Sequence, residues 1–342
     1  MSILAGVPGE VGNVTVVHRR RSFPSTVAVL VSTVALGSTL GLSGCVSSDD
    51  EPDRTAPVES TVDGVAVKLL DAGTSPTDPL AWFADDGEQS GKFSVTWGYG
   101  QEVIGGDEQG TADGAAPYSE LSANLPYTAS ATTDGDQLES TMTIGTPEGS
   151  NEALDDDENG ELNDDIATAE GFRMVQKYSD DGKVNNRSFA SPENASDSAR
   201  AAIENNLGQM TSLPLVFPEE AVGEGARWTV TGQIEDSAAG TPMRQTVTYT
   251  IASRNGSQVN LDVDIERTPT VKQMAGTDLE VMDSTTESTG SLTLDLRRPL
   301  PVSGSVKTTT EITYGQPESP VTVVQESRTT STWSSDGEQA EN

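Results

Sequence analysis

Residues 259–265 read VNLDVDI, an unbroken alternation of apolar and polar side chains. Successive side chains of a β-strand point to opposite faces, so a period of two predicts a strand with one buried and one solvated face. Such repeated strands predict a mainly β (α+β) domain with a meandering antiparallel sheet. The same alternation recurs at residues 93–99, 138–144, 172–178, 228–234, 292–296 and 306–314.

Short turn sequences separate the runs, and one segment has a different period. SDDG at 179–182 and RNG at 254–256 predict hairpins. A helix is expected near 196–213, where apolar residues recur every three or four positions, with Ser196 as N-cap and Pro214 ending it. We therefore expect a curved open or half-barrel sheet with this one amphipathic helix packed on its apolar face. The apolar stripe consists of Ala199, Ile203, Leu207, Met210 and Leu213.

The N-terminus has the pattern of an export signal. The basic stretch HRRR at 18–21 is followed by an uncharged, mostly apolar run at 26–42 and then by LSGC at 42–45. The run is shorter than the ~20 residues that a spanning helix needs, which favours a cleaved signal over a membrane anchor. The string RRSF at 20–23 resembles a twin-arginine signal, so the general and twin-arginine export routes both stay open.

LSGC at 42–45 resembles the lipobox of bacterial lipoproteins. In that class the Cys thiol receives a diacylglyceryl group and the chain is cut directly before it. The resemblance implies cleavage between Gly44 and Cys45, lipidation of Cys45, and attachment to the extracytoplasmic face of the cell membrane. Residues 1–44 are then the signal peptide.

The remaining chain divides by composition. Residues 45–64 are rich in Ser, Asp, Glu, Pro and Thr, which predicts an acidic flexible tether. Residues 65–334 are expected to form one antiparallel β domain, because no Pro- or Gly-rich linker divides the strands. Within it, residues 145–170 are predicted to be an acidic loop, and residues 335–342 a disordered tail.

Charge and residue usage exclude several functions. The formal net charge of −34 argues against nucleic-acid binding, which needs clustered Lys and Arg. His18 and Cys45 are the chain's single His and Cys, so the processed chain has no Cys/His zinc site and no Ser–His or Cys–His nucleophile. We expect no enzyme activity; hydrolysis by a carboxylate pair is the remaining catalytic alternative.

Two further strings are similar to segments of a group of uncharacterised actinobacterial lipoproteins. They are PEEAVGEGARWTV at 218–230 and LDLRRPLPVSG at 294–304, and they follow the helix in the same order as in that group. The group is a domain of unknown function, so the resemblance implies class and location but no active site.

The acidic stretch DDDENGELNDDI at 155–166 contains the spacing that opens a calcium loop. Position twelve of such a loop supplies a bidentate carboxylate, but here it is Ile166, and the nearest acid lies one residue earlier. A solvated loop is the alternative interpretation. Candidate ligands of a weak calcium site are Asp155, Asp157, Asn159 and Asp165.

We expect a non-catalytic binding module for a lipid or other apolar ligand. Its candidate cavity lies between sheet and helix; for Trp228, a packed core role is the alternative. The alternative function is a structural or interaction lipoprotein that uses its acidic surface towards an envelope protein. Candidate cavity residues are Trp228, Ile203, Leu207 and Met210.

Overall fold

The computed structural model describes residues 53–336 except 63, 86, 106–115, 237–239, 275 and 318–320. The described residues all belong to one compact unit, Asp49–Asn342. The predicted signal peptide, the cleavage site at Gly44 and the lipidation site at Cys45 lie outside the described residues, as do residues 337–342 of the predicted tail. The predicted start of that tail is wrong, because Ser335 is the last residue of a strand.

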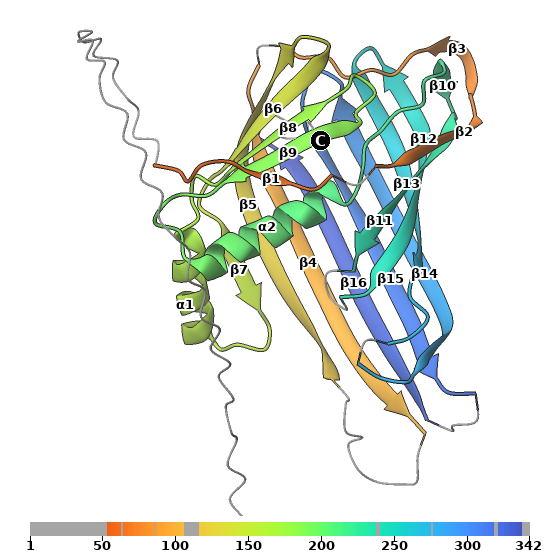
Figure 1. Cartoon of the computed structure of the whole chain (residues 1–342). Helices are drawn as coiled ribbons and strands as arrows, with labels where there is room; N and C mark the ends of the chain where they lie inside the picture. The colour runs from red at the N-terminus through yellow and green to blue at the C-terminus, as the bar shows by residue number, and fades with distance from the viewer. Residues whose placement is uncertain are drawn as a thin grey trace, which may run out of the picture. The chain divides into compact units, whose positions relative to one another are not determined.

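One large antiparallel sheet dominates the described part of the chain (Figure 1). Its strand order is β1-β9-β8-β6-β5-β4-β16-β15-β14-β13-β12-β11-β2, β7 also pairs with β5, and β3 and β10 form a separate pair. The strands are β1 Val58–Ser60, β2 Ala66–Asp71, β3 Thr74–Asp78, β4 Gln89–Ile104, β5 Ala116–Asp134, β6 Gln137–Ile144, β7 Glu148–Asn151, β8 Arg173–Tyr178, β9 Val184–Ala190, β10 Val222–Glu224, β11 Arg227–Glu235, β12 Pro242–Asn255, β13 Gln258–Pro269, β14 Glu280–Asp295, β15 Ser303–Gly315 and β16 Thr322–Ser335.

Two meanders make up this sheet. Strands β11 to β16 are neighbours in chain order, and β4, β5, β6, β8 and β9 form a second run. The runs meet where β16 pairs with β4 in antiparallel register. The predicted mainly β class and the antiparallel meander are therefore confirmed.

The alternation of apolar and polar residues in β13 reflects one buried and one exposed face, as predicted. Val259, Leu261, Val263 and Ile265 are buried, whereas the Asn and Asp residues between them are exposed. Both predicted turns are also present: residues 179–182 connect β8 to β9, and residues 254–256 lie where β12 turns into β13. Gly182 and Gly256 take the positive φ values, 91° and 62°, that these tight turns require.

Helix α2, Asp197–Thr211, occupies the segment that was predicted to be helical. The Ser196 hydroxyl accepts a hydrogen bond from the backbone N–H of Ala199, which satisfies one free donor of the first turn. Ile203, Leu207 and Met210 are buried and belong to the same hydrophobic cluster as side chains of the sheet. In Figure 1, α2 runs across β5 and β4.

The prediction of an acidic loop at 145–170 is wrong. This stretch contains β7 and a second helix, α1, Asp156–Ala167. Asp155 and Glu158 form a capping box: Glu158 N–H donates to Asp155 Oδ1 at 2.9 Å, and Asp155 N–H donates to Glu158 Oε2 at 3.1 Å. Three acids in the first turn also stabilise the positive end of the helix.

The predicted flexible tether is partly wrong. Residues 58–60 form β1, the edge strand that pairs antiparallel with β9. Ahead of this strand, Arg54 forms a β-bridge with Pro192, and Thr55 N–H donates to Ser191 O at 2.9 Å. Backbone pairing needs no apolar side chains, so a Ser-, Glu- and Pro-rich segment joins the sheet without a hydrophobic pattern.

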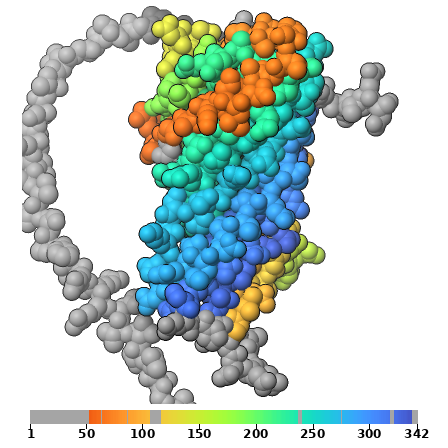
Figure 2. All heavy atoms as spheres, turned by 90° about the vertical axis from the view of Figure 1, so that its right-hand side faces the viewer, coloured from red at the N-terminus to blue at the C-terminus, as the bar shows by residue number. Residues whose placement is uncertain are grey.

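No helix in the described ranges is long and apolar enough to cross a membrane. Figure 2 shows the side of the molecule that lies at the right of Figure 1. On this side the orange N-terminal strands β2 and β3 lie directly against the green and cyan strands that follow α2. This contact agrees with the pairing of β2 with β11 and of β3 with β10.

Candidate ligand cavity

A cavity of about 920 Å³ is lined by α2, by the segment that follows it, and by strands from both meanders. This volume lies within the range of small-molecule sites, roughly 300–1,000 Å³. Exposed residues such as Leu121 and Lys183 are part of the lining, so the cavity opens to solvent. Apolar residues of the lining include Trp97, Leu121, Met210, Leu213, Val230 and Trp333.

The wall after α2 is held by side chains of the sheet. Gln245 Nε2 donates to Ser212 O at 2.7 Å, and Tyr249 Oη donates to Pro214 O at 2.9 Å. Trp228 Nε1 donates to Val216 O at 2.9 Å. These three bonds satisfy alternate backbone carbonyls of residues 212–216, so the wall is fixed in place without regular secondary structure.

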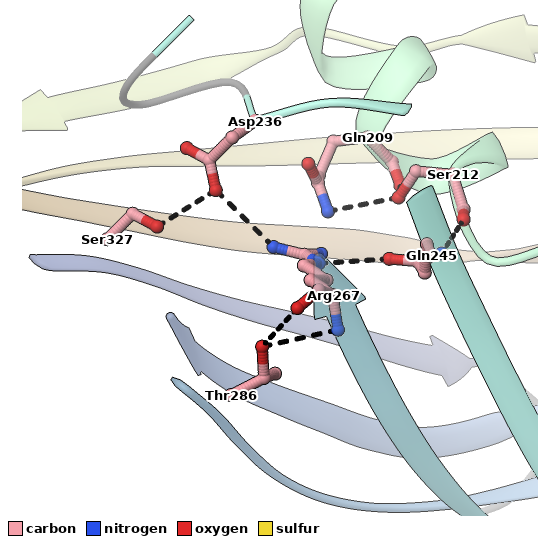
Figure 3. Close-up of polar contacts among 7 residues, drawn as sticks. All are labelled: Gln209, Ser212, Asp236, Gln245, Arg267, Thr286 and Ser327. Carbon is pink, nitrogen blue, oxygen red and sulfur yellow. Dashed lines mark hydrogen bonds and ion pairs between the residues drawn. The ribbon is translucent and has the colours of Figure 1, made fainter. Parts of the chain in front are cut away.

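A buried polar network continues from this wall into the sheet (Figure 3). Arg267 on β13 donates from Nε to Gln245 Oε1 at 3.0 Å, and its Nη1 lies 3.6 Å from Asp236 Oδ2. Ser327 Oγ donates to the same Asp236 oxygen at 2.8 Å. Burial lowers the pKa of Arg267, and the Asp236 carboxylate opposes that shift. The network connects α2 to β12, β13 and β16 through Ser212 and Gln245.

The predicted cavity residues separate into two groups. Met210 lines the cavity. Trp228, Ile203 and Leu207 do not line it: each is at most 1 % exposed and packs within the main hydrophobic cluster. Their assignment to the cavity is therefore wrong, and Trp228 has the alternative core role, with its ring centroid 5.4 Å from that of Tyr249.

The predicted calcium ligands have other roles in α1. Asp155 caps the helix, and Asp157 is exposed in its first turn. Asn159 accepts from Asn151 N–H at 2.8 Å and donates to Asn151 O at 3.1 Å. Four residues further on, Asn163 bonds both backbone groups of Gly149 on β7 in the same way. The two side-chain amides therefore attach α1 to β7 by bonding the backbone N–H and C=O groups of β7, as a neighbouring strand would.

Asp165, the fourth predicted calcium ligand, faces the other helix. Its Oδ2 accepts from Ser198 Oγ at 2.6 Å. The hydroxyls of Ser198 and Ser196 hold the pKa of Asp165 below its usual range. Among the described residues, no group of three or more His, Cys, Asp or Glu side chains is arranged to hold a metal ion. Residues 155–166 therefore form a capped helix and do not have the geometry of a calcium loop.

The two strings that resemble the lipoprotein group have structural roles. In the first, Val222 is fully buried, Gly225 has a φ of 81°, and Trp228 bonds the wall described above. In the second, Asp295 accepts from Arg297 Nε at 2.9 Å and from Nη2 at 2.6 Å. These interactions set the turns that lead into β11 and out of β14.

A polar row on the cavity wall was missed by the sequence patterns. Ser140 on β6 pairs with Gln176 on β8, which pairs with Arg187 on β9. All three residues line the cavity. When the Gln176 amide oxygen faces the guanidinium, it accepts from Arg187 Nη2 at 3.0 Å and from Nε at 2.8 Å. The available signal was that each of these three strands has a polar residue at a position where the alternation expects an apolar one. Recognising that the three residues are neighbours requires the register between the strands.

The chain gives no significant match to any protein-family model or to any curated protein. The proposed function therefore rests on the geometry of the cavity.

Proposed function

We propose that this chain is a non-catalytic binding protein that holds a lipid or other apolar ligand in the cavity beside α2. The cavity of about 920 Å³ is the observation that supports this proposal most directly. Its lining combines apolar side chains with polar and charged ones, and sites for small organic ligands likewise combine apolar walls with placed polar groups. Three side-chain bonds hold the wall after α2, so the cavity does not depend on ligand to keep its shape.

We also infer that the open sheet is a half-barrel and that α2 covers its apolar face. The support is that Ile203, Leu207 and Met210 share one hydrophobic cluster with residues of both meanders, such as Leu125 and Leu261. In this arrangement the apolar stripe of α2 would close part of the sheet's inner face, and the space left beside its C-terminal half would be the cavity.

We propose that the protein is attached to the extracytoplasmic face of the cell membrane through a lipid on Cys45. The support is the LSGC string that follows a basic and then an apolar segment. Labelling of cells with an alkyne analogue of palmitate tests this anchor. We expect the wild type to be labelled, and we expect C45S to be unlabelled and released from the membrane fraction. Label on C45S would contradict the proposal.

Extraction of bound molecules tests the binding function. The full chain carrying C45S, which removes any acyl group of its own, is purified without detergent and extracted with organic solvent. Mass spectrometry is expected to find a lipid class at close to one molecule per chain. An extract with no lipid above the level of an unrelated protein from the same cells would contradict the proposal.

A further inference from the structure

One cation on the cavity wall lies in apolar surroundings. The row formed by Ser140, Gln176 and Arg187, here called the polar row, crosses β6, β8 and β9. The flanking rows on the same strands are apolar and belong to or pack against the main hydrophobic cluster. One flanking row is Leu138, Tyr178 and Val184; the other is Met142, Met174 and Phe189.

Among the described residues, Arg187 has no carboxylate partner. Within residues 53–336, apart from the gaps given above, its side chain bonds only Gln176, from Nε and Nη2 to the amide oxygen when that oxygen faces the guanidinium. Burial lowers the pKa of Arg187, and no neighbouring acid opposes that shift. The buried Arg267, in contrast, faces Asp236. Thus, although the net charge of the chain is −34, no acid in the described part of the chain lies against this half-buried cation.

An uncompensated cation in a partly dry site is costly, because desolvation disfavours its charge. The presence of Arg187 at this position is explained if a bound anion compensates its charge. A guanidinium has five N–H donors in a planar fork that matches carboxylate and phosphate oxygens. With its amide oxygen towards the guanidinium, Gln176 engages Nε and Nη2, which leaves Nη1 for a ligand and fixes the plane of the fork.

We propose that Arg187, positioned by Gln176 and assisted by the Ser140 hydroxyl, binds the anionic headgroup of an amphipathic lipid whose apolar part occupies the cavity. The headgroup is a carboxylate or a phosphate, both of which present the oxygens that a guanidinium recognises. This inference rests on the proposed binding function and adds the class of ligand to it.

Matched ligands test the role of Arg187. Oleate, 1-oleoyl lysophosphatidate and uncharged oleyl alcohol have equivalent acyl chains and differ in the headgroup. Each is titrated calorimetrically into the full chain carrying C45S, below its critical micelle concentration. We expect at least one of the two anions to bind about 10-fold or more tightly than oleyl alcohol, and their order identifies the headgroup. Inorganic phosphate alone is expected to give no saturable binding, because it lacks the apolar part.

Variants separate the headgroup from the cavity. R187Q is expected to remove the preference for the anion and to leave the affinity for oleyl alcohol unchanged within about twofold, whereas R187K keeps part of the preference. K183Q is the matched control, because Lys183 is an exposed cation on the same cavity lining, and it is expected to keep the full preference. Circular dichroism checks that each variant is folded.

The outcomes distinguish the two proposals. If the wild type binds none of the three lipids, the proposed function fails. If it binds oleyl alcohol as tightly as both anions, or if folded R187Q keeps the preference, the cavity stands and the role of Arg187 is overturned. Saturable binding of inorganic phosphate with the affinity of the lipids would also overturn it, because the ligand would then be a free anion.

Discussion

Arg267 Nη1 and Asp236 Oδ2 form an ion pair of 3.6 Å whose side chains are only 5 % and 2 % exposed. Arg267 also donates to Gln245, which in turn bonds the carbonyl of Ser212 at the end of α2. Removing one member of a buried pair leaves the other charge uncompensated, which typically costs about 3–5 kcal/mol. The pair is therefore expected to stabilise the cavity wall as well as the sheet.

The variant D236A tests this ion pair. We expect its free energy of unfolding in urea to fall by about 3–5 kcal/mol, and we expect D236L/R267M to recover part of that loss. D134A serves as the control, because the pair of Asp134 with Lys177 is exposed and its loss should not shift the urea midpoint measurably. A D236A midpoint equal to that of the wild type would contradict the role given to the pair.

The turn after β14 predicts a specific dependence on pH. Hydrogen bonds from the Arg297 side chain, against the opposing effect of burial, lower the pKa of Asp295 to about 2. The unfolded chain has a pKa of about 3.9 at this position, so it binds more protons between pH 4 and pH 2. The stabilisation is complete above pH 4 and is lost as the pH falls towards 2. Because Arg297 is half exposed, we expect a contribution of about 1–2 kcal/mol.

Urea unfolding of the wild type and D295N measures this contribution. Many other acids titrate in the same range, so the readout is the difference in unfolding free energy between the two proteins. That difference is expected to shrink by about 1–2 kcal/mol between pH 4.5 and pH 2. A difference that stays constant across this range would show that Asp295 keeps an ordinary pKa.

The capped helix predicts how residues 155–166 respond to mutation. D155A removes the N-cap and is expected to lower the free energy of unfolding by about 1 kcal/mol, whereas D157N leaves it unchanged. Millimolar calcium is expected to leave the thermal midpoint of all three proteins unchanged. A rise of the wild-type midpoint with calcium that both variants abolish would support a calcium loop instead.

The sheet and α2 were predictable because their signals are local. In β13 the apolar residues alternate at every second position, and Ser196 caps an apolar stripe with a spacing of three and four. A single strand or helix needs no partner to show these periods. The same reasoning explains why both hairpin turns were predicted from a few residues around Gly182 and Gly256.

Helix α1 was missed because its helical signal is weak. Ile166 is its one buried residue, and Asn159, Gly160 and Asn163 have low helix propensity. The usable signal was Asp155 followed three residues later by Glu158, which is the spacing of a capping box. Strand β1 was missed for a related reason, since its backbone pairs with β9 while its side chains stay largely exposed.

Of the four predicted cavity residues, Met210 lines the cavity and the other three do not. Trp228, Ile203 and Leu207 are apolar and lie on the expected elements, yet a sequence does not show which apolar side chains meet neighbours and which meet a space. Arg187 was missed because its significance depends on the register of β9 against β8 and β6. Such register is a property of pairs of strands and cannot be read from one strand.

Gly208 offers a place to add a large side chain at the cavity lining. It lies on α2 and lines the cavity, and a Cβ added there would have no heavy atom within 4 Å. Phe also has a higher helix propensity than Gly, so G208F is expected to fold normally. G160F is the matched control, because Gly160 lies on α1, away from the cavity lining, and also has open space at its Cβ position.

Fluorescence titration with a neutral pyrene-labelled long-chain alcohol is the measurement that tests the cavity most directly. For the full chain carrying C45S, we predict saturable binding of one probe per chain, a loss of affinity of about 10-fold or more in G208F, and unchanged affinity in G160F. Absence of saturable binding, or equal affinity of G208F and G160F, would contradict the assignment of the cavity as a ligand site.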